Sequence, residues 1–399
     1  MRKKIRFGYT YPMRTALVAA AFSVAAGTLF AQRLIWLGTL GGDWSTAYDV
    51  SADGTVVVGV SDVNRQNRAF RWTVSGGMQD LGAPGDSIAY GVSADGSVVV
   101  GVSNSRAFRW TTPSVIQYLG VLQGASWSVA YDVSANGSVV VGDSGRRGFR
   151  WTEAGGMQPI NSFFPESSVR AVSADGSVAV GSVPGYNQRL FAYRWNADGS
   201  ATNLSFWSIE RAVALGVSPD GGVAVGWGSQ ANDGWWQRAW AWWGQVGGVR
   251  LPSQSQAFAH AVSGNGVIVG RNSSWRAIRW VHCNGRDVEQ DLNTVYSSLL
   301  SSGSSLSVAY AISPNGRYIV GRGYNAATGR NEAYLLDTCG HNGDVDGNGC
   351  VDDADLLRVL FAFGGTSTVC DPKREDVNCD GVIDDADLLI VLFNFGTGC

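Results

Sequence analysis

Charged residues, histidine and cysteine are scarce in most of this 399-residue chain. Only 16% of its residues are charged, three are histidine, and five of the six cysteines lie after residue 338. Beyond residue 31 there is no run of basic residues that would bind nucleic acid. Neither a CxxC pair, typical of zinc sites, nor the GxSxG motif of a serine nucleophile occurs. The sequence therefore predicts no nucleic-acid partner and shows no familiar catalytic motif.

The N-terminal 31 residues differ from the rest of the chain. They contain no acid, and their basic residues are Arg2, Lys3, Lys4, Arg6 and Arg14. An apolar run from Ala16 to Phe30 follows, and Ala31 is a small residue suited to cleavage. The run is too short for a comfortable membrane span. We therefore predict a signal peptide over 1–31, in preference to an uncleaved anchor, and no membrane span in the mature, secreted chain.

Export to an oxidising compartment favours disulfides among the six cysteines. The lack of CxxC spacing and the near absence of histidine disfavour zinc. A complete set of bridges would include Cys283, which lies far from the other five in the sequence. Six cysteines allow many pairings, and the sequence leaves the choice among them open.

Residues 40–338 repeat one phrase seven times. The phrase is AYDVSADGTVVVG at 47–59, and it recurs at 89–101, 130–142, 170–181, 215–226, 260–270 and 310–321. The turn glycines are Gly54, Gly96, Gly137, Gly176, Gly221, Gly266 and Gly316, spaced 39 to 50 residues apart. Each phrase predicts two strands joined by a two-residue Asp-Gly or Asn-Gly hairpin. A strand like RAFRWT (68–73) and one like MQDLG (78–82) complete a four-stranded unit.

Four-stranded units of this length are typical of propeller blades, because one blade cannot bury both of its faces alone. The seventh copy stops after its third strand, EAYLLD, whereas RLIWLGTL near the start of the mature chain matches a fourth strand. We therefore predict a mainly β fold over 32–338, a seven-bladed β-propeller whose N-terminal strand completes the last blade. A parallel β-helix is the alternative, disfavoured because its coils are usually shorter.

The units resemble the HAF repeats of bacterial extracellular proteins. That pattern joins an Ala-Phe strand, a DLG strand and the phrase A-x-x-[VI]-S-x-x-G-x-V-V-G, and the resemblance covers residues 40–338. Arginine stands where the family name expects histidine, as at Arg68 and Arg106. HAF repeats imply no particular reaction, so the resemblance bears on the fold and on an extracellular location.

Many conspicuous side chains in the repeats have a structural explanation. The turn aspartates should accept hydrogen bonds from their own turns; they are Asp53, Asp95, Asp175 and Asp220. The tryptophans that recur at one strand position should pack between blades; they are Trp72, Trp110, Trp151, Trp195, Trp242 and Trp280. The three histidines, His260, His282 and His341, have no recognisable triad around them.

Seven tryptophans do not follow the repeat. They are Trp44, Trp127, Trp207, Trp227, Trp235, Trp236 and Trp275. We place them in connections from a fourth strand to the next first strand, or from a second strand to a third. In a propeller these connections open on one face, around the channel. Because a clustered apolar patch usually marks a binding surface, we predict that this face binds a polysaccharide or a protein. The alternative is that long loops bury these rings.

The last 61 residues carry twelve acids and three bases, a net charge of −9, and a duplicated motif. Two twelve-residue loops place side-chain oxygens at positions 1, 3, 5, 9 and 12 and glycine at position 6. The first loop offers Asp344, Asp346, Asn348, Asp352 and Asp355, and the second offers Asp376, Asn378, Asp380, Asp384 and Asp387. Cys350 and Val382, at position 7, would each supply a main-chain carbonyl. The loops predict two bound Ca²⁺ ions, with an acidic solvated tail as the alternative.

A helical pattern follows each loop, LLRVLFAF in one and LLIVLFNF in the other, and no helix precedes either loop. Two loop–helix units with Asp at position 12 resemble a type I dockerin over 343–397. The resemblance implies attachment to a cohesin-like or cell-surface protein through 339–399. The family's recognition pair at loop positions 10 and 11 corresponds to Asp353–Ala354 and Asp385–Ala386, where serine and threonine are usual. Leucine and phenylalanine replace the usual basic residues further along each helix.

These features together predict a secreted, non-catalytic binding protein. Its propeller (32–338) would bind a glycan or a protein, and its calcium-dependent α-helical tail (339–399) would anchor it to a cohesin-like partner. An extracellular carbohydrate-active enzyme, a glycoside hydrolase or a lyase, is the alternative. Dockerins accompany such enzymes, and a catalytic carboxylate pair is defined by its spacing in space, which the sequence does not show.

Overall fold

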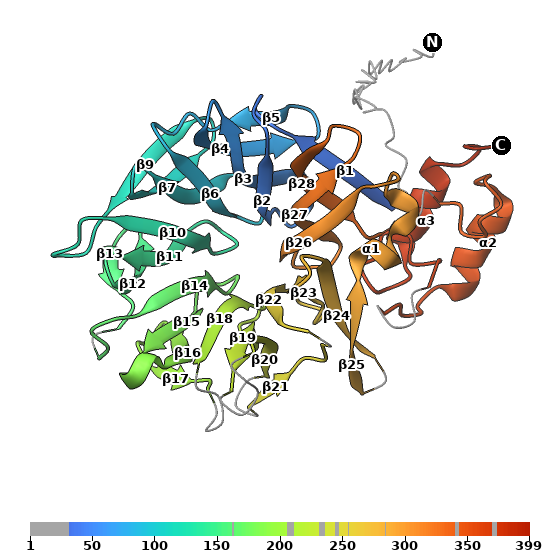
Figure 1. Ribbon diagram of the computed structural model, residues 1–399. Helices are drawn as coiled ribbons and strands as arrows, with labels where there is room; N and C mark the ends of the chain where they lie inside the picture. The colour runs from blue at the N-terminus through green and yellow to red at the C-terminus, as the bar shows by residue number, and fades with distance from the viewer. Residues whose placement is uncertain are drawn as a thin grey trace, which may run out of the picture.

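In the computed structural model, antiparallel sheets surround a central channel, and two short helices lie outside the ring at one side (Figure 1). The structure describes residues 32–399 except 162, 206–210, 231–235, 244–246, 254, 284, 340–342 and 369–372. The predicted signal peptide, 1–31, lies outside the described residues. Within the described part of the chain, no helix is long and apolar enough to cross a membrane.

Five antiparallel sheets of four strands form separate blades. The first contains β2 (Ser45–Val50), β3 (Val56–Val63), β4 (Gln66–Thr73) and β5 (Gly77–Asp80). The second contains β6 (Ser87–Val92), β7 (Val98–Ser103), β8 (Arg106–Thr111) and β9 (Val115–Gly120). The third contains β10 (Ser128–Val133), β11 (Val139–Ser144), β12 (Arg147–Thr152) and β13 (Gly156–Pro159). Another contains β22 (Ala257–Val262), β23 (Ile268–Asn272), β24 (Ala277–Cys283) and β25 (Arg286–Asp291). The last contains β26 (Ser305–Ile312), β27 (Tyr318–Asn325), β28 (Arg330–Asp337) and β1 (Arg33–Gly38).

The prediction of seven separate blades is wrong, because five blades stand alone and the remaining strands share one eight-stranded sheet. Its strands are β14 (Ser168–Val172), β15 (Val178–Pro184), β16 (Leu190–Asn196), β17 (Ala201–Asn203), β18 (Arg211–Val217), β19 (Val223–Ser229), β20 (Arg238–Trp243) and β21 (Gly248–Arg250). The short β17 pairs only with Tyr193–Trp195 of β16. The uncovered start of β16 pairs in parallel with β18, Leu190 opposite Arg211, and joins the two repeats.

The predicted closure by the N-terminal strand is confirmed. β1 pairs antiparallel with β28, from Arg33 opposite Asp337 to Gly38 opposite Ala333. Leu37 is 6% exposed and lies in the hydrophobic cluster between the last and the first blade. The buried Ser45 hydroxyl donates to the Gly38 carbonyl and accepts the Ala333 N–H at 2.8 Å. The two ends of the ring are therefore held by a β-ladder, a buried leucine and a bridging serine.

The repeated phrase specifies how neighbouring repeats meet. The turn is wider than the predicted two residues, because Ser51 N–H donates to the Val56 carbonyl at 2.9 Å and leaves residues 52–55 in the loop. The Ser51 hydroxyl donates to Asp53 (2.7 Å), which confirms the structural role of the turn aspartate. Ala52 N–H then donates to the Ala94 carbonyl of the next repeat at 2.9 Å. The phrase therefore encodes both a hairpin and a contact between repeats.

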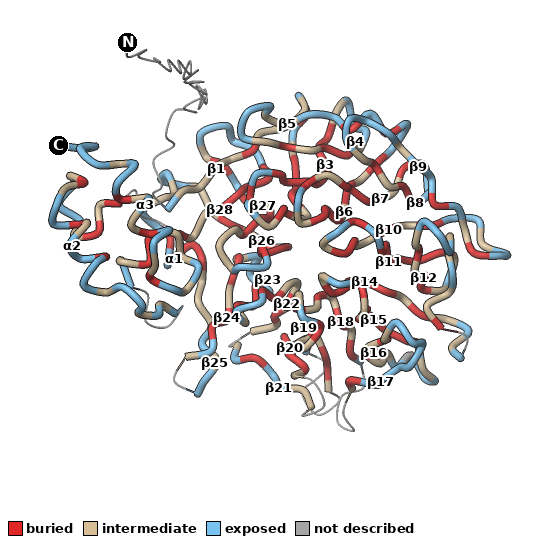
Figure 2. Tube along the Cα trace, turned by 180° about the vertical axis from the view of Figure 1, so that it is seen from behind, coloured by how far each residue is buried: buried red, intermediate tan, exposed pale blue. Residues whose placement is uncertain are grey.

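Glycine follows the turn aspartate because of both conformation and packing. Gly96 has φ +69°, a left-handed conformation that other residues rarely adopt. A Cβ on Gly96 would also collide with Val56 of the preceding repeat. The six recurring tryptophans are buried in the clusters between repeats, as predicted. Buried residues therefore lie along the strands, and exposed residues lie at the connections, as Figure 2 shows.

The C-terminal tail forms its own small core beside β1 and β24. Short helical turns, α1 (Leu292–Val295) and η3 (Ser297–Leu299), precede β26, and a further turn, η1, spans Tyr186–Gln188. The tail helices are α2 (Asp353–Ala362) and α3 (Asp385–Phe393). Each loop–helix unit contributes three equivalent residues to one buried cluster, Val345, Val351 and Val359 from the first and Val377, Ile383 and Val391 from the second.

Disulfides and one arginine fix the tail. Cys350 is bonded to Cys399, and Cys339 to Cys379, while Cys283 of the propeller is also disulfide-bonded. Arg317 forms two hydrogen bonds with Asp337, at 2.7 and 2.9 Å, and donates to the Asn378 carbonyl of the second loop at 3.3 Å. The second loop is therefore attached directly to the propeller.

Candidate functional site

The first predicted calcium loop, residues 344–355, gathers three carboxylates. Oxygen atoms of Asp344, Asp346 and Asp355 all lie within 4.8 Å of one another. The Asp355 side chain is fully buried and accepts the N–H groups of Asp346 and Asp352, both at 2.9 Å. Gly349, at position 6, has φ +93°, which allows the sharp turn of such loops. A buried carboxylate flanked by two others is a donor set that suits a hard cation.

The other predicted ligands of this loop also hold its shape. Asn348 accepts the Cys350 N–H at 2.7 Å. The Cys350 sulfur is in a disulfide, so its main-chain carbonyl is the donor that position 7 offers. Asp352 lies outside the cluster of three carboxylates and is the N-cap of α2, where it accepts the Ala354 N–H at 2.8 Å. Position 9 therefore starts the helix in this structure.

The second loop, residues 376–387, has a similar pattern of hydrogen bonds. Asp376 accepts the N–H groups of Asp380 and Gly381, both at 3.1 Å. The fully buried Asp387 accepts those of Asn378 and Asp384, both at 2.9 Å. The pKa of Asp376 and that of Asp387 are both raised, chiefly by burial.

The remaining positions of the second loop also match the first. Asp380 accepts the Val382 N–H at 2.9 Å, and Asp384 caps α3 by accepting the Ala386 N–H at 2.9 Å. Each loop has four aspartates and one asparagine at its ligand positions; the asparagine is at position 5 in the first loop and at position 3 in the second. The buried carboxylates of both loops are of the kind that a bound cation would neutralise.

The helices that follow the loops expose a duplicated apolar surface. Its members are Leu357, Leu360, Phe361 and Phe363 in and after α2, and Leu389, Leu392, Phe393 and Phe395 in and after α3. Phe361 is 87% exposed and Phe393 83%. The predicted recognition pairs, Asp353–Ala354 and Asp385–Ala386, are exposed at the starts of the same helices. We call this set the apolar tail surface; an exposed apolar patch of this kind marks an interaction site.

The structure separates the seven unusual tryptophans. Trp44, Trp127, Trp236 and Trp275 lie in the predicted connections, and Trp275 is 59% exposed. Trp227 lies inside β19 rather than in a connection, which corrects the prediction; its ring meets Phe258 edge-on at 6.3 Å. Trp207 and Trp235 lie outside the described residues. No ring contact joins two of these tryptophans among the described residues, and an arginine lies over the ring of Trp44, of Trp236 and of Trp275.

Two of these arginines stand beside the channel. The Arg271 guanidinium lies 4.1 Å from the Trp275 ring centre and 4.2 Å from that of Phe258. The Arg322 guanidinium lies 5.7 Å from the Trp44 ring centre. Arg271 belongs to β23, just before the connection that carries Trp275, and Arg322 lies within β27.

A ring of seven side chains, which the sequence analysis did not single out, lines the channel. Each first strand of a repeat has a register shift at a residue that lines the channel, and β26 has a second shift near its start. The channel residues are Tyr48, Tyr90, Tyr131, Arg170, Leu215, His260 and Tyr310. An unpaired residue of this kind re-aims its side chain. A Cβ on Gly59 would collide with the Thr46 carbonyl beside the shift, which explains the strand glycine of the phrase. In the sequence, the members of this ring occupy one variable position, three residues before the serine of the repeated phrase.

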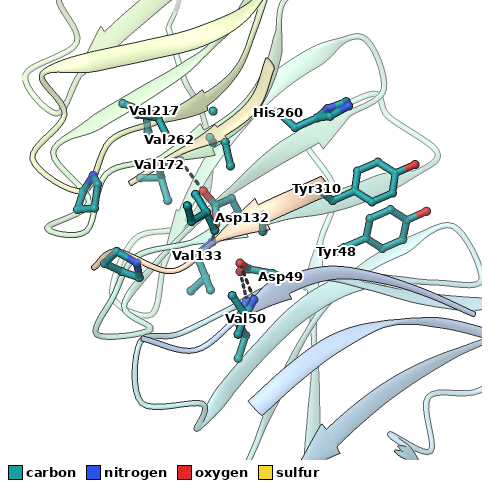
Figure 3. Close-up of a pocket in the computed structure, with 18 of the residues that line it drawn as sticks. Tyr48, Asp49, Val50, Asp132, Val133, Val172, Val217, His260, Val262 and Tyr310 are labelled. Atoms are coloured by element: carbon teal, nitrogen blue, oxygen red, sulfur yellow. Dashed lines mark hydrogen bonds between the residues drawn. The ribbon is translucent and has the colours of Figure 1, made fainter. Parts of the chain in front are cut away.

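Neighbouring members of this channel ring are in contact. Centroids of Tyr48 and Tyr90 are 5.2 Å apart, those of Tyr48 and Tyr310 5.1 Å, and those of His260 and Tyr310 5.2 Å. Figure 3 shows Tyr48 and Tyr310 directing their hydroxyls away from Val50 and Val133, which lie further along the channel. The ring therefore divides the channel into a mouth, on the side of the tryptophan connections, and an inner pocket of about 220 Å³.

Two carboxylates face the inner pocket, and each accepts hydrogen bonds from backbone N–H groups. Asp49 accepts the N–H groups of Val50 and Val92, both at 2.8 Å. Asp132 is held in the same way by Val133 (2.7 Å) and by Val172 (2.8 Å) of the next repeat. Burial, together with the nearby Asp132 charge, raises the pKa of Asp49 to about 8, and burial raises that of Asp132 to about 7.

Comparison with known proteins supports both parts of the chain. Residues 342–392 match the family model of the dockerin type I domain. A search of curated proteins found no match. Among solved structures, the chain is similar to an oligogalacturonate lyase from Vibrio parahaemolyticus, with 10% identity, a TM-score of 0.52 and coverage of 78% of this chain and 96% of that one.

Two further structures show the same likeness. One is an oligogalacturonate lyase in complex with manganese (12% identity, TM-score 0.51, coverage of 77% of this chain and 93% of that one). The other is hydrazine synthase from Kuenenia stuttgartiensis (12%, 0.50, 75% and 96%). At such identities the likeness shows the fold alone. The chain is therefore a β-propeller protein with a C-terminal dockerin type I domain, a domain type that binds calcium and implies a cohesin partner. The HAF resemblance stays a prediction.

Proposed function

We propose that the chain is an exported, non-catalytic binding protein. The propeller takes a glycan at the channel mouth, and the dockerin domain, braced by two calcium ions, attaches the protein to a cohesin-like partner. The duplicated apolar tail surface carries this proposal, because it stands on the two helices that the calcium loops position. Disulfides in the tail support an oxidising, extracellular location.

The apolar tail surface also indicates the kind of partner. Phe361 and Phe393 occupy equivalent places in the two units and are nearly fully exposed. An interface built on exposed leucine and phenylalanine requires a complementary apolar patch, whereas the serine, threonine and basic residues usual in dockerins favour polar partners. We therefore expect a cohesin whose contact surface is apolar.

Binding of immobilised cohesin domains by the full chain tests this proposal. The wild-type protein should bind in calcium and be released by a chelator. Replacing both phenylalanines, F361S with F393S, should weaken binding by about 2 kcal/mol or more, as for interface hot spots. The matched control is F163S, which changes a phenylalanine that is 81% exposed on the propeller. Equal binding by all three proteins, or binding that ignores calcium, would contradict the proposal.

A carbohydrate-active enzyme is the second candidate. Asp49 and Asp132 favour it, because their raised pKa values and mutual repulsion are properties of acid–base pairs. The fold of oligogalacturonate lyase is also similar. Against it, each carboxylate already accepts two backbone N–H groups that link neighbouring repeats. Incubation with neutral and acidic polysaccharides decides between them: products that accumulate with the wild-type chain and not with D49N/D132N would establish the enzyme.

A further inference from the structure

Three arginines lie at or beside the channel ring, and an acidic side chain is within ion-pair distance of one of them. Arg170, a member of the ring, lies 4.1 Å from the Tyr131 ring centre and 3.8 Å from Asp143. Arg271 and Arg322 come from the second strands of the two repeats that carry His260 and Tyr310. Among the described residues, neither of these two arginines forms an ion pair with an acidic side chain.

The charges of Arg271 and Arg322 act on the same tyrosine. Burial raises the pKa of Tyr310, and both guanidinium charges oppose that rise. Burial also lowers the pKa of Arg271. Two guanidinium charges that act on one partly buried tyrosine are unfavourable unless an anion balances them. Of Arg170, Arg271 and Arg322, only Arg170 has an acidic side chain, Asp143, within ion-pair distance in the described part of the chain.

Uncharged hydrogen-bonding groups accompany the two arginines. The Nε2 atom of His260 is buried and has no hydrogen-bond partner in the described structure. Burial, with the Arg271 charge, lowers the pKa of His260 to about 3, so the imidazole is neutral. Figure 3 shows His260, Tyr310 and Tyr48 at the same end of the pocket. These groups can donate to and accept from hydroxyls that a ligand brings.

Aromatic faces complete the arrangement. The Trp275 ring lies against Arg271 and the Trp44 ring near Arg322, so each cation is paired with a flat apolar surface. Planar guanidinium groups bind carboxylates in a bidentate manner. Rings beside them suit the apolar face of a pyranose, whereas an acidic peptide or free phosphate has no use for them.

From this arrangement we propose that the channel mouth binds a carboxylate-bearing sugar of an acidic polysaccharide. Arg271 and Arg322 hold the carboxylate. Tyr48, Tyr310 and His260 bond the sugar hydroxyls, and Trp44 and Trp275 flank the ring. The proposal names the ligand class for the glycan site of the proposed function and rests on it. The inner pocket of about 220 Å³ is below the roughly 300–1,000 Å³ of sites that enclose drug-sized ligands. The mouth therefore engages one sugar unit of a longer chain.

Calorimetric titration of the full chain tests the ligand class. Polygalacturonate is the probe, and highly methyl-esterified pectin is the matched control with the same sugar and a masked carboxylate. Polyglutamate, dextran sulfate and neutral dextran provide an acidic peptide, a sulfated sugar and an uncharged sugar. Binding of polygalacturonate at least about tenfold tighter than of the ester, as for loss of one charge-assisted hydrogen bond, supports the proposal.

Variants assign the residues. R271Q/R322Q should weaken binding of polygalacturonate by at least about tenfold. The charge-matched control R286Q/R358Q changes two exposed arginines away from the mouth and should stay within about twofold. R271K/R322K keeps both charges and removes the planar fork, so it should also weaken carboxylate binding. This variant tests the site even if R271Q/R322Q folds poorly.

The possible outcomes distinguish failure of the carboxylate site from failure of the glycan-binding function. Binding of neutral dextran or of the ester with equal affinity would retain glycan binding and overturn the carboxylate site. Binding of none of the four glycans would refute the glycan-binding function itself. Polyglutamate and every acidic sugar could bind equally, and R286Q/R358Q could lose this binding as much as R271Q/R322Q. That result would show charge attraction without a site and would also overturn the proposal.

Discussion

Closure of the propeller by its N-terminal strand can be tested with one pair of leucines. Leu37 of β1 is 6% exposed and packs between the last and the first blade. Leu119 of β9 is 7% exposed, occupies the same place in an internal repeat and lies in an equivalent cluster. If β1 is as firmly paired as an internal strand, L37A and L119A should destabilise the protein equally.

The magnitude follows from burial. Truncating a leucine at such a site removes its buried methyl groups and leaves a cavity, at a cost of about 2–5 kcal/mol. Urea unfolding, followed by the fluorescence of the buried inter-blade tryptophans, gives the free energy for each variant. We expect the two values to agree within about 1 kcal/mol. A loss below about 0.5 kcal/mol for L37A beside a full loss for L119A would mean that β1 frays from β28, and the closure would be refuted.

The remaining predictions concern other parts of the chain. Deleting residues 32–40 should destabilise the propeller more than L37A, because β28 would become an exposed edge; an unchanged urea midpoint would contradict this. Calcium titration after chelation should show two sites, D355A should remove one and D387A the other, and a stoichiometry near zero in the unmodified chain would refute both. W236A and W275A change rings that are 46% and 59% exposed, so the free energy of unfolding should move by less than about 0.5 kcal/mol while glycan binding weakens. The pKa of Asp49 is raised to about 8 in the folded protein, so the folded state binds this proton more tightly than the unfolded state does. Stability should therefore fall as pH rises from about 4 to 8. D49N should flatten that fall in urea midpoints measured across the range.

The sequence by itself determined the local units. The seven phrases predicted hairpins, inter-blade tryptophans and the strand missing from the last repeat, because each depends on neighbours a few residues away or on a count of strands. The calcium loops were equally local, since their ligands recur at fixed spacing around a glycine turn. In the first loop, Asp344, Asp346 and Asp355 converge as that spacing implies.

Only the tertiary structure decided what the repeats build together. A single parallel pair, Leu190 opposite Arg211, merges two repeats into one sheet, and no pattern along the chain reveals it. Trp227 was expected in a connection because it does not follow the repeat, yet β19 extends far enough to include it.

The channel ring shows the same limit most clearly. Tyr48, His260 and Tyr310 occupy one variable position in copies that lie far apart in sequence. A register shift in each first strand turns that position toward a common axis. Strand alternation assigns a residue to one of two faces of its own sheet, whereas a shift of one residue reverses the face. The channel mouth therefore exists only when the sheets close around it.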